Sequence, residues 1–84
     1  MTAFVPVPQS DNSPPVLKLG DVGQAVLEIQ QRLQQLGFSI GVADGHFGPK
    51  TQQAIQQFQM RQGIDATGYV DVLTLAELGF QVDD

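Results

Sequence analysis

The side chains that could carry out acid–base or nucleophilic chemistry are few and scattered along the chain. The sequence has nine Asp and Glu residues, a single histidine, His46, and no cysteine. A hydrolase needs a nucleophile with its base, a pair of carboxylates in a cleft, or a metal ion. The acids of the patterned region fall at predicted turns or exposed helix faces without a matching base: Glu28, Asp44, Asp65, Asp71 and Glu77. We therefore predict that the chain is not an enzyme and has no catalytic residues.

Metal and cofactor chemistry is disfavoured for the same reason. A zinc site needs three or four donors, usually histidine, cysteine or carboxylate groups placed close together. His46 lacks such companions, and the absence of cysteine removes thiolate ligands, disulfides and thiol nucleophiles. We expect no metal site and no cofactor.

The charge pattern excludes two classes of partner. The formal net charge is −5, and the four basic residues do not form the basic stripe that a phosphate backbone requires: Lys18, Arg32, Lys50 and Arg61. The longest apolar run is far shorter than the roughly 20 residues that cross a bilayer. We predict neither nucleic-acid binding nor a membrane span.

The chain of 84 residues is long enough for one hydrophobic core and a tail. Residues 1–16 hold all but one of the prolines, which predicts a disordered, flexible leader. An alternative is that its apolar run, residues 4–8, docks on a protein partner. Residues 17–80 form the predicted domain, and residues 81–84 form a short acidic tail.

Apolar residues recur at helical spacing in the domain. The first stripe predicts a helix with Asp21 as N-cap and Gly37 just beyond its end, and consists of Val26, Ile29, Leu33 and Leu36. Gly48-Pro49 opens a second helix that ends at Gly63, with the stripe Ala54, Ile55 and Phe58. Asp71 is the predicted N-cap of a short third helix that ends at Gly79, with one apolar face supplied by Val72, Leu75 and Leu78. The fold class is therefore predicted to be all-α, a compact three-helix bundle with glycine-rich loops.

A loose internal repeat precedes the second and third helices. Gly45-His46-Phe47-Gly48, followed by Thr51, is echoed by Gly68-Tyr69-Val70-Asp71, followed by Thr74. We expect two similar loops, each of which pins a helix start by inserting Phe47 or Val70 into the core.

Residues 17–79 closely resemble the peptidoglycan-binding domain found at the ends of bacterial cell-wall hydrolases. The resemblance rests on an ordered set of residues: Leu19-Gly20-Asp21-Val22-Gly23, Val26, Ile29-Gln30, Leu33, Leu36-Gly37, Asp44-Gly45-His46-Phe47-Gly48-Pro49, Thr51, Ala54-Ile55, Phe58-Gln59, Gly63-Ile64, Gly68, Val70-Asp71 and Thr74. It implies a three-helix module that attaches a partner activity to peptidoglycan, through the glycan strand or the stem peptide, with no chemistry of its own.

Two functional hypotheses follow. The first is a cell-wall-binding module, located in the cell envelope or periplasm if it is exported from a longer precursor. The second is a protein-interaction adaptor with the same fold, located in the cytoplasm if Met1 is the true start, because the first residues do not form a secretory signal.

Peptidoglycan offers hydroxyl, acetamido, amide and carboxylate groups, so short-range hydrogen-bonding side chains and an occasional ring would suit it. We expect a shallow groove formed by both loops and the glutamine faces beside them. The candidate ligand contacts are Asp44, Gly45, His46, Thr51, Gln52, Gln56, Tyr69 and Asp71. A structural role is the alternative for several of them, because Asp-Gly favours a tight turn and helix-start threonines often cap backbone amides. Gln30 and Gln59 are expected to bond the neighbouring loops instead of a ligand.

Overall fold

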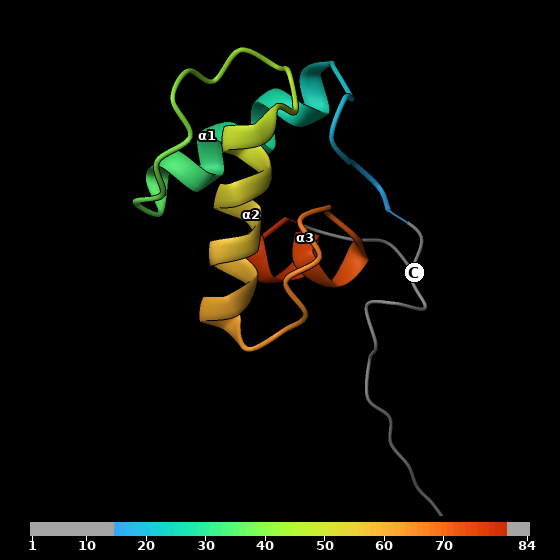
Figure 1. Ribbon diagram of the computed structural model, residues 1–84, viewed down its shortest axis with the longest axis vertical. Helices are drawn as coiled ribbons and strands as arrows, with labels where there is room; N and C mark the ends of the chain where they lie inside the picture. Colours follow the sequence, from blue (N-terminus) through green and yellow to red (C-terminus); the bar gives the residue numbers. More distant parts are fainter. Residues whose placement is uncertain (1–14, 81–84) are drawn as a thin grey trace, which may run out of the picture.

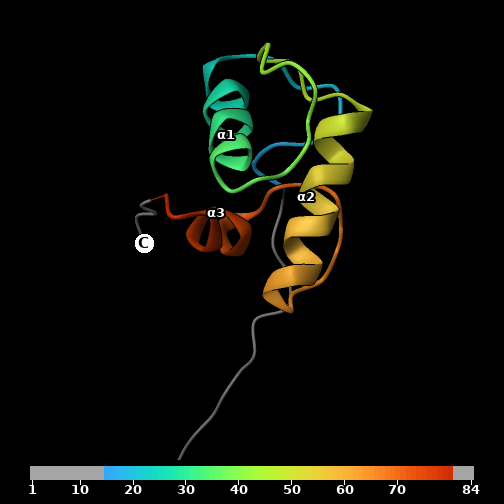
Figure 2. The same cartoon turned by 90° about the vertical axis from the view of Figure 1, so that its left-hand side faces the viewer.

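The computed structural model describes residues 15–80, which form an all-α fold of three helices, as predicted. Helix α1 spans Gln24–Gln35, α2 spans Pro49–Gln62 and α3 spans Val72–Leu78. Figure 1 shows the order of the helices along the chain, and Figure 2 shows α1 and α3 on the same side of α2. The predicted leader, apart from residues 15 and 16, and the predicted tail lie outside the described residues.

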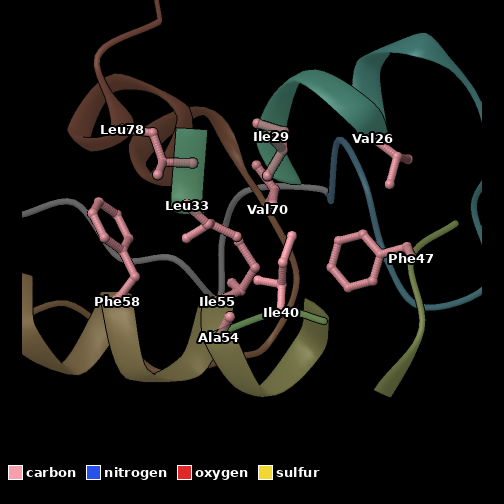
Figure 3. Packing of buried hydrophobic residues seen from close by; sticks show 10 residues of the cluster. All are labelled: Val26, Ile29, Leu33, Ile40, Phe47, Ala54, Ile55, Phe58, Val70 and Leu78. Carbon is pink, nitrogen blue, oxygen red and sulfur yellow. The ribbon is translucent and has the colours of Figure 1, made fainter. Parts of the chain in front are cut away.

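One apolar core joins all three helices. The predicted stripes of α1 and α2 are buried, apart from Leu36, which is 41% exposed. Leu78 of α3 and three residues from the connections complete the core, as Figure 3 shows: Ile40, Phe47 and Val70. A helix of seven residues is unstable alone in water, so α3 depends on this packing.

The same hydrogen-bonding arrangement ends each helix. A glycine in the left-handed region follows the last turn, and the residue after it donates its N–H to a carbonyl five positions earlier. The three donor–acceptor distances are 2.9 Å from Phe38 to Leu33, 3.0 Å from Ile64 to Gln59 and 3.1 Å from Phe80 to Leu75. The predicted glycine stops are confirmed at all three helices.

The helix starts confirm one predicted cap and correct another. Asp71 caps α3, since its Oδ1 accepts the Thr74 N–H at 2.9 Å. Asp21 does not cap α1, because the helix begins at Gln24 and its N-cap is Gly23. The Asp21 carboxylate instead accepts the Lys18 backbone N–H at 3.0 Å, which closes a turn before the helix.

The loops predicted before α2 and α3 are similar in structure. We call residues 44–48 the first corner and residues 67–71 the second corner. Phe47 and Val70 are 2% and 0% exposed, so each corner inserts one apolar side chain into the core, as predicted.

Each corner is bonded to the amide of a glutamine from the preceding helix. In the first corner, Gln30 Oε1 accepts the Gly45 N–H at 2.8 Å. Gln30 Nε2 donates to the His46 carbonyl at 2.8 Å and to Thr51 Oγ1 at 3.0 Å. Gln30 is 1% exposed, so this buried amide satisfies the backbone of the corner and fixes it to α1 and α2.

The second corner repeats this arrangement with Gln59 of α2. Gln59 Oε1 accepts the Gly68 N–H at 3.0 Å, and Nε2 donates to the Tyr69 carbonyl at 2.9 Å and to Thr74 Oγ1 at 3.0 Å. We call Gln30 and Gln59 the glutamine clamps. They confirm that both glutamines bond the neighbouring loops, and they show that the buried threonine hydroxyls accept from glutamine.

Residues 16–23, the N-terminal segment, connect the two corners. At one end, Leu17 exchanges two backbone hydrogen bonds with Val70, at 2.8 and 3.1 Å, and Val16 N–H also donates to Val70. At the other end, Phe47 N–H donates to the Asp21 carbonyl and Gly23 N–H donates to the Gly45 carbonyl, both at 2.9 Å. The corners are therefore held by one short stretch of chain as well as by the core.

We expect that removing the amide of a glutamine clamp lowers the stability of the domain strongly. Gln59→Leu would leave the buried Gly68 N–H without its acceptor and remove the amide donor to the Tyr69 carbonyl and Thr74 Oγ1, and we expect the free energy of unfolding to fall by about 3 kcal/mol. Gln62→Leu, at an exposed position of the same helix, should change it by less than about 0.5 kcal/mol. Urea denaturation of both variants measures the difference. Equal stability of the two variants would contradict the role of the clamp.

We expect alanine substitutions at Gly45, in the first corner, and at Gly37, outside it, to lower stability by different amounts. Gly45 and Gly37 have φ of 80° and 95°, where any other L-residue is strained. A Cβ at Gly37 would meet open space, whereas a Cβ at Gly45 would lie 3.2 Å from the Gly23 carbonyl oxygen. We expect Gly37→Ala to cost about 1 kcal/mol from backbone strain and Gly45→Ala about 2–3 kcal/mol, since backbone must move as well. Thermal unfolding of the two variants in parallel tests this ranking, which a larger loss for Gly37→Ala would reverse.

Candidate functional site

An open groove of about 280 Å³ lies beside the first corner. One wall of the groove is the loop of residues 40–46, and the other is the start of α2 from Gly48 to Thr51. Gln30 of α1 also lines the groove. The Gln30 clamp bonds the backbone of Gly45 and His46, and Gly23 of the N-terminal segment also bonds Gly45, so this end of the groove is hydrogen-bonded to the rest of the domain. This is the surface that we regard as the candidate binding site.

Asp44 supplies the negative charge of the groove. Its Oδ1 accepts the His46 backbone N–H at 2.9 Å, which is the Asp-Gly turn expected from the sequence, and lies 3.4 Å from Gln30 Nε2. The hydrogen bond from the His46 backbone lowers the pKa of the Asp44 carboxyl, and the Gln30 amide and the His46 side chain act in the same direction. The side chain is exposed, so a charged carboxylate faces solvent at the groove.

Lys50 supplies the positive charge. It stands in the first turn of α2, and its side chain passes over Gly41, where a Cβ would lie 3.3 Å from Lys50 Cδ. Residues 15–80 contain one ion pair, which joins Lys18 and Asp21. Lys50 Nζ makes no hydrogen bond or ion pair within the same residues. Lys50 and Asp44 therefore line the same groove without neutralising each other.

The groove also has apolar surface. Val42 is 75% exposed at its rim, and Ile40 is 3% exposed and forms part of both the groove and the core. No Phe, Tyr or Trp side chain is among the groove residues. Charged and apolar contacts are thus available within one hollow, whereas a flat aromatic platform is not.

The structure divides the predicted ligand contacts into four groups, three of which are described first. Asp44 and His46 are exposed and line the groove. Gly45 and Thr51 lie beside them but are buried and bonded to the Gln30 clamp. Asp71 is fully buried as the N-cap of α3 and has a structural role there.

Gln52, Gln56 and Tyr69 lie around the second corner. A Cβ on Gly68 would meet Gln52 Cγ at 3.0 Å and Gln56 Nε2 at 3.1 Å, so both glutamines pack against this corner. Tyr69 is half-buried, and none of these three residues lines the groove. The groove beside the first corner therefore does not extend to these residues of the second corner.

Sequence reasoning missed Lys50, Gly41 and Val42 as groove residues. Lys50 follows Pro49 at the start of α2, a position that places its side chain beside the loop before the helix. The available signal was the predicted helix start at Gly48-Pro49. It puts Lys50 in the first turn of the helix, close in sequence to the turn at Asp44. Gly41 and Val42 gave no such signal, because the path of an irregular loop cannot be derived from periodicity.

Two classes of site are not present in the part of the chain that the structure describes. None of the three helices there is long and apolar enough to cross a bilayer. Across residues 15–80, no three His, Cys, Asp or Glu side chains are grouped so that they could hold a metal ion.

Comparison with known proteins identifies relatives of this chain. The profile of a family described as "Putative peptidoglycan binding domain" matches residues 22–78. The N-acetylmuramoyl-L-alanine amidase CwlM of Mycobacterium tuberculosis is 43% identical over 58 residues, which are 69% of this chain and 14% of that protein. A spore cortex-lytic enzyme of Oceanobacillus iheyensis is 40% identical over 76 residues, which are 83% of this chain and 28% of that enzyme.

A solved structure supports the same relationship. The SleB N-terminal domain superposes with a TM-score of 0.72 at 35% identity, covering 74% of this chain and 85% of that chain. The chain spans only a small part of the two enzymes, so the similarity concerns a shared domain and not their whole length. On the profile match and these relatives, the chain belongs to the peptidoglycan-binding domain family.

Proposed function

We propose that the groove at the first corner attaches this domain to bacterial cell-wall peptidoglycan. The observation that carries the proposal is the open polar groove, held on clamped backbone, in a chain of the peptidoglycan-binding domain family. A fixed surface loses little conformational entropy when it binds, which favours adhesion by a small domain.

The chemistry of the groove suits such a ligand. Peptidoglycan presents amides, hydroxyls and carboxylates, and the groove presents an ammonium group, a carboxylate and an imidazole. Val42 adds apolar surface that a methyl group of the ligand can cover. Several weak contacts of this kind bind a repeated polymer by acting together.

We propose that the domain contributes binding and no chemistry of its own. The only hydroxyl of the groove, Thr51 Oγ1, accepts from the Gln30 amide, and Thr51 as a residue is 2% exposed, so this hydroxyl is not placed as a nucleophile. The names of the matched relatives describe an amidase and a spore cortex-lytic enzyme, which supports a location at the cell wall. These relatives favour wall attachment over an adaptor inside the cell.

Co-sedimentation with purified, insoluble peptidoglycan sacculi tests the proposal. We expect the wild-type protein to pellet with the sacculi at micromolar concentration. Val42→Arg places a long charged side chain at the rim of the groove and should lower the apparent affinity about tenfold, a change of roughly 1.4 kcal/mol. Val42 is 75% exposed, so the substitution should leave the fold intact.

Met60→Arg is the matched control for this experiment. Met60 is 62% exposed near the end of α2 and is not a groove residue, so the variant should pellet like the wild type. Failure of the wild-type protein to sediment with sacculi would reject the proposed function. Equal loss of binding in both variants would place the site elsewhere.

A further inference from the structure

The groove has no Phe, Tyr or Trp side chain that could stack on a sugar ring. Sugar faces are commonly covered by aromatic side chains, which combine a flat apolar face with polar edges. Phe47 is the aromatic residue closest in sequence to the groove residues, and it is 2% exposed because its ring fills the core. Tyr69 lies at the second corner, outside the groove. The His46 imidazole is the only ring apart from that of Pro49 along its walls.

The charges of the groove provide a second argument. Lys50 Nζ has no hydrogen bond or ion pair within residues 15–80. The Oδ1 atom of Asp44 is used by the turn, while Oδ2 has no hydrogen-bond partner in this part of the protein. An unpaired cation and an unpaired carboxylate oxygen in one hollow complement a ligand that carries both a carboxylate and an N–H or ammonium group.

The two components of peptidoglycan differ in this respect. A glycan strand of N-acetylated sugars presents hydroxyl and acetamido groups, for which a separated charge pair gives no selectivity. A peptide stem presents carboxylates, amide N–H groups and small apolar side chains. Val42, 75% exposed at the rim, and Ile40 beneath it provide apolar contacts of the size of a methyl group.

From these features we propose that the groove recognises the peptide stem of peptidoglycan and not its glycan strand. Lys50 binds a carboxylate of the stem, Asp44 accepts from an amide or ammonium group, and Val42 covers an alanine-sized side chain between them. This assignment rests on the proposed function and names the part of the polymer that the same groove contacts.

Two soluble probes from one source separate the possibilities. An amidase releases the peptide stems from purified sacculi and leaves peptide-free glycan strands, which are purified and solubilised as short fragments. Hydrolysis also frees a lactyl carboxylate on each muramic acid, so these carboxylates are converted to methyl amides to restore the uncharged amide of the intact polymer. Each probe is titrated into the ¹⁵N-labelled full chain while backbone amide shifts are recorded. We expect the stems to shift the amides of Gly41, Asp44, His46 and Lys50, and the glycan fragments to leave them unchanged at equal concentration.

Charge-removing variants test the two ionic contacts. Lys50→Met and Asp44→Asn should each weaken stem binding about fivefold, the upper range for a solvent-exposed ion pair. Asn retains the side-chain oxygen that accepts the His46 N–H, so the turn is preserved. Lys18→Met and Glu28→Gln are controls with the same change of charge at exposed positions outside the groove, and they should bind stems like the wild type.

The outcomes distinguish this inference from the proposed function. Groove shifts produced by glycan fragments and not by stems would overturn the inference while leaving attachment to peptidoglycan intact. Unchanged stem affinity in both Lys50→Met and Asp44→Asn would also overturn it. If intact sacculi fail to retain the wild type and neither probe shifts the groove, the proposed function fails together with the inference.

Discussion

The hydrogen bonding of two buried glutamine amides is the constraint on which the rest of the structure depends. Irregular loops carry backbone N–H and C=O groups that cannot be buried without partners. Gln30 and Gln59 supply those partners from within a helix, and each bonds a glycine N–H, an aromatic residue's carbonyl and a threonine hydroxyl. This allows a domain with a small core to keep two glycine-rich corners in fixed positions.

The clamp is present at both corners, but only the first corner carries the candidate site, because the surroundings of the two corners differ. The first corner follows a long connection that rises away from the helices and leaves an open groove against the start of α2. The second corner follows a short connection, and Gln52 and Gln56 of α2 pack closely against its glycine. The same local bonding therefore supports an open surface at one corner and close packing at the other.

Most of the fold was predictable from the sequence, because helical periodicity, Pro49 and the glycine stops are local signals. The insertion of Phe47 and Val70 was predictable from the internal repeat. The N-cap of α1 was not, since Asp21 is drawn into pairing with the first corner, a contact between distant residues. The groove was predicted only in part for the same reason: Asp44 and His46 were marked by turn chemistry, whereas Lys50 and Val42 meet them only through the path of the loop.

The N-terminal segment has a mechanical consequence for a domain that anchors. Tension transmitted along the chain from the residues before Val16 first reaches the bonds between Leu17 and Val70. Those bonds join the segment to the second corner, whereas the groove lies at the first corner, beyond Gly20 and Asp21. Load applied from that side therefore falls first on the bonds to the second corner, whereas the proposed binding groove lies at the first corner.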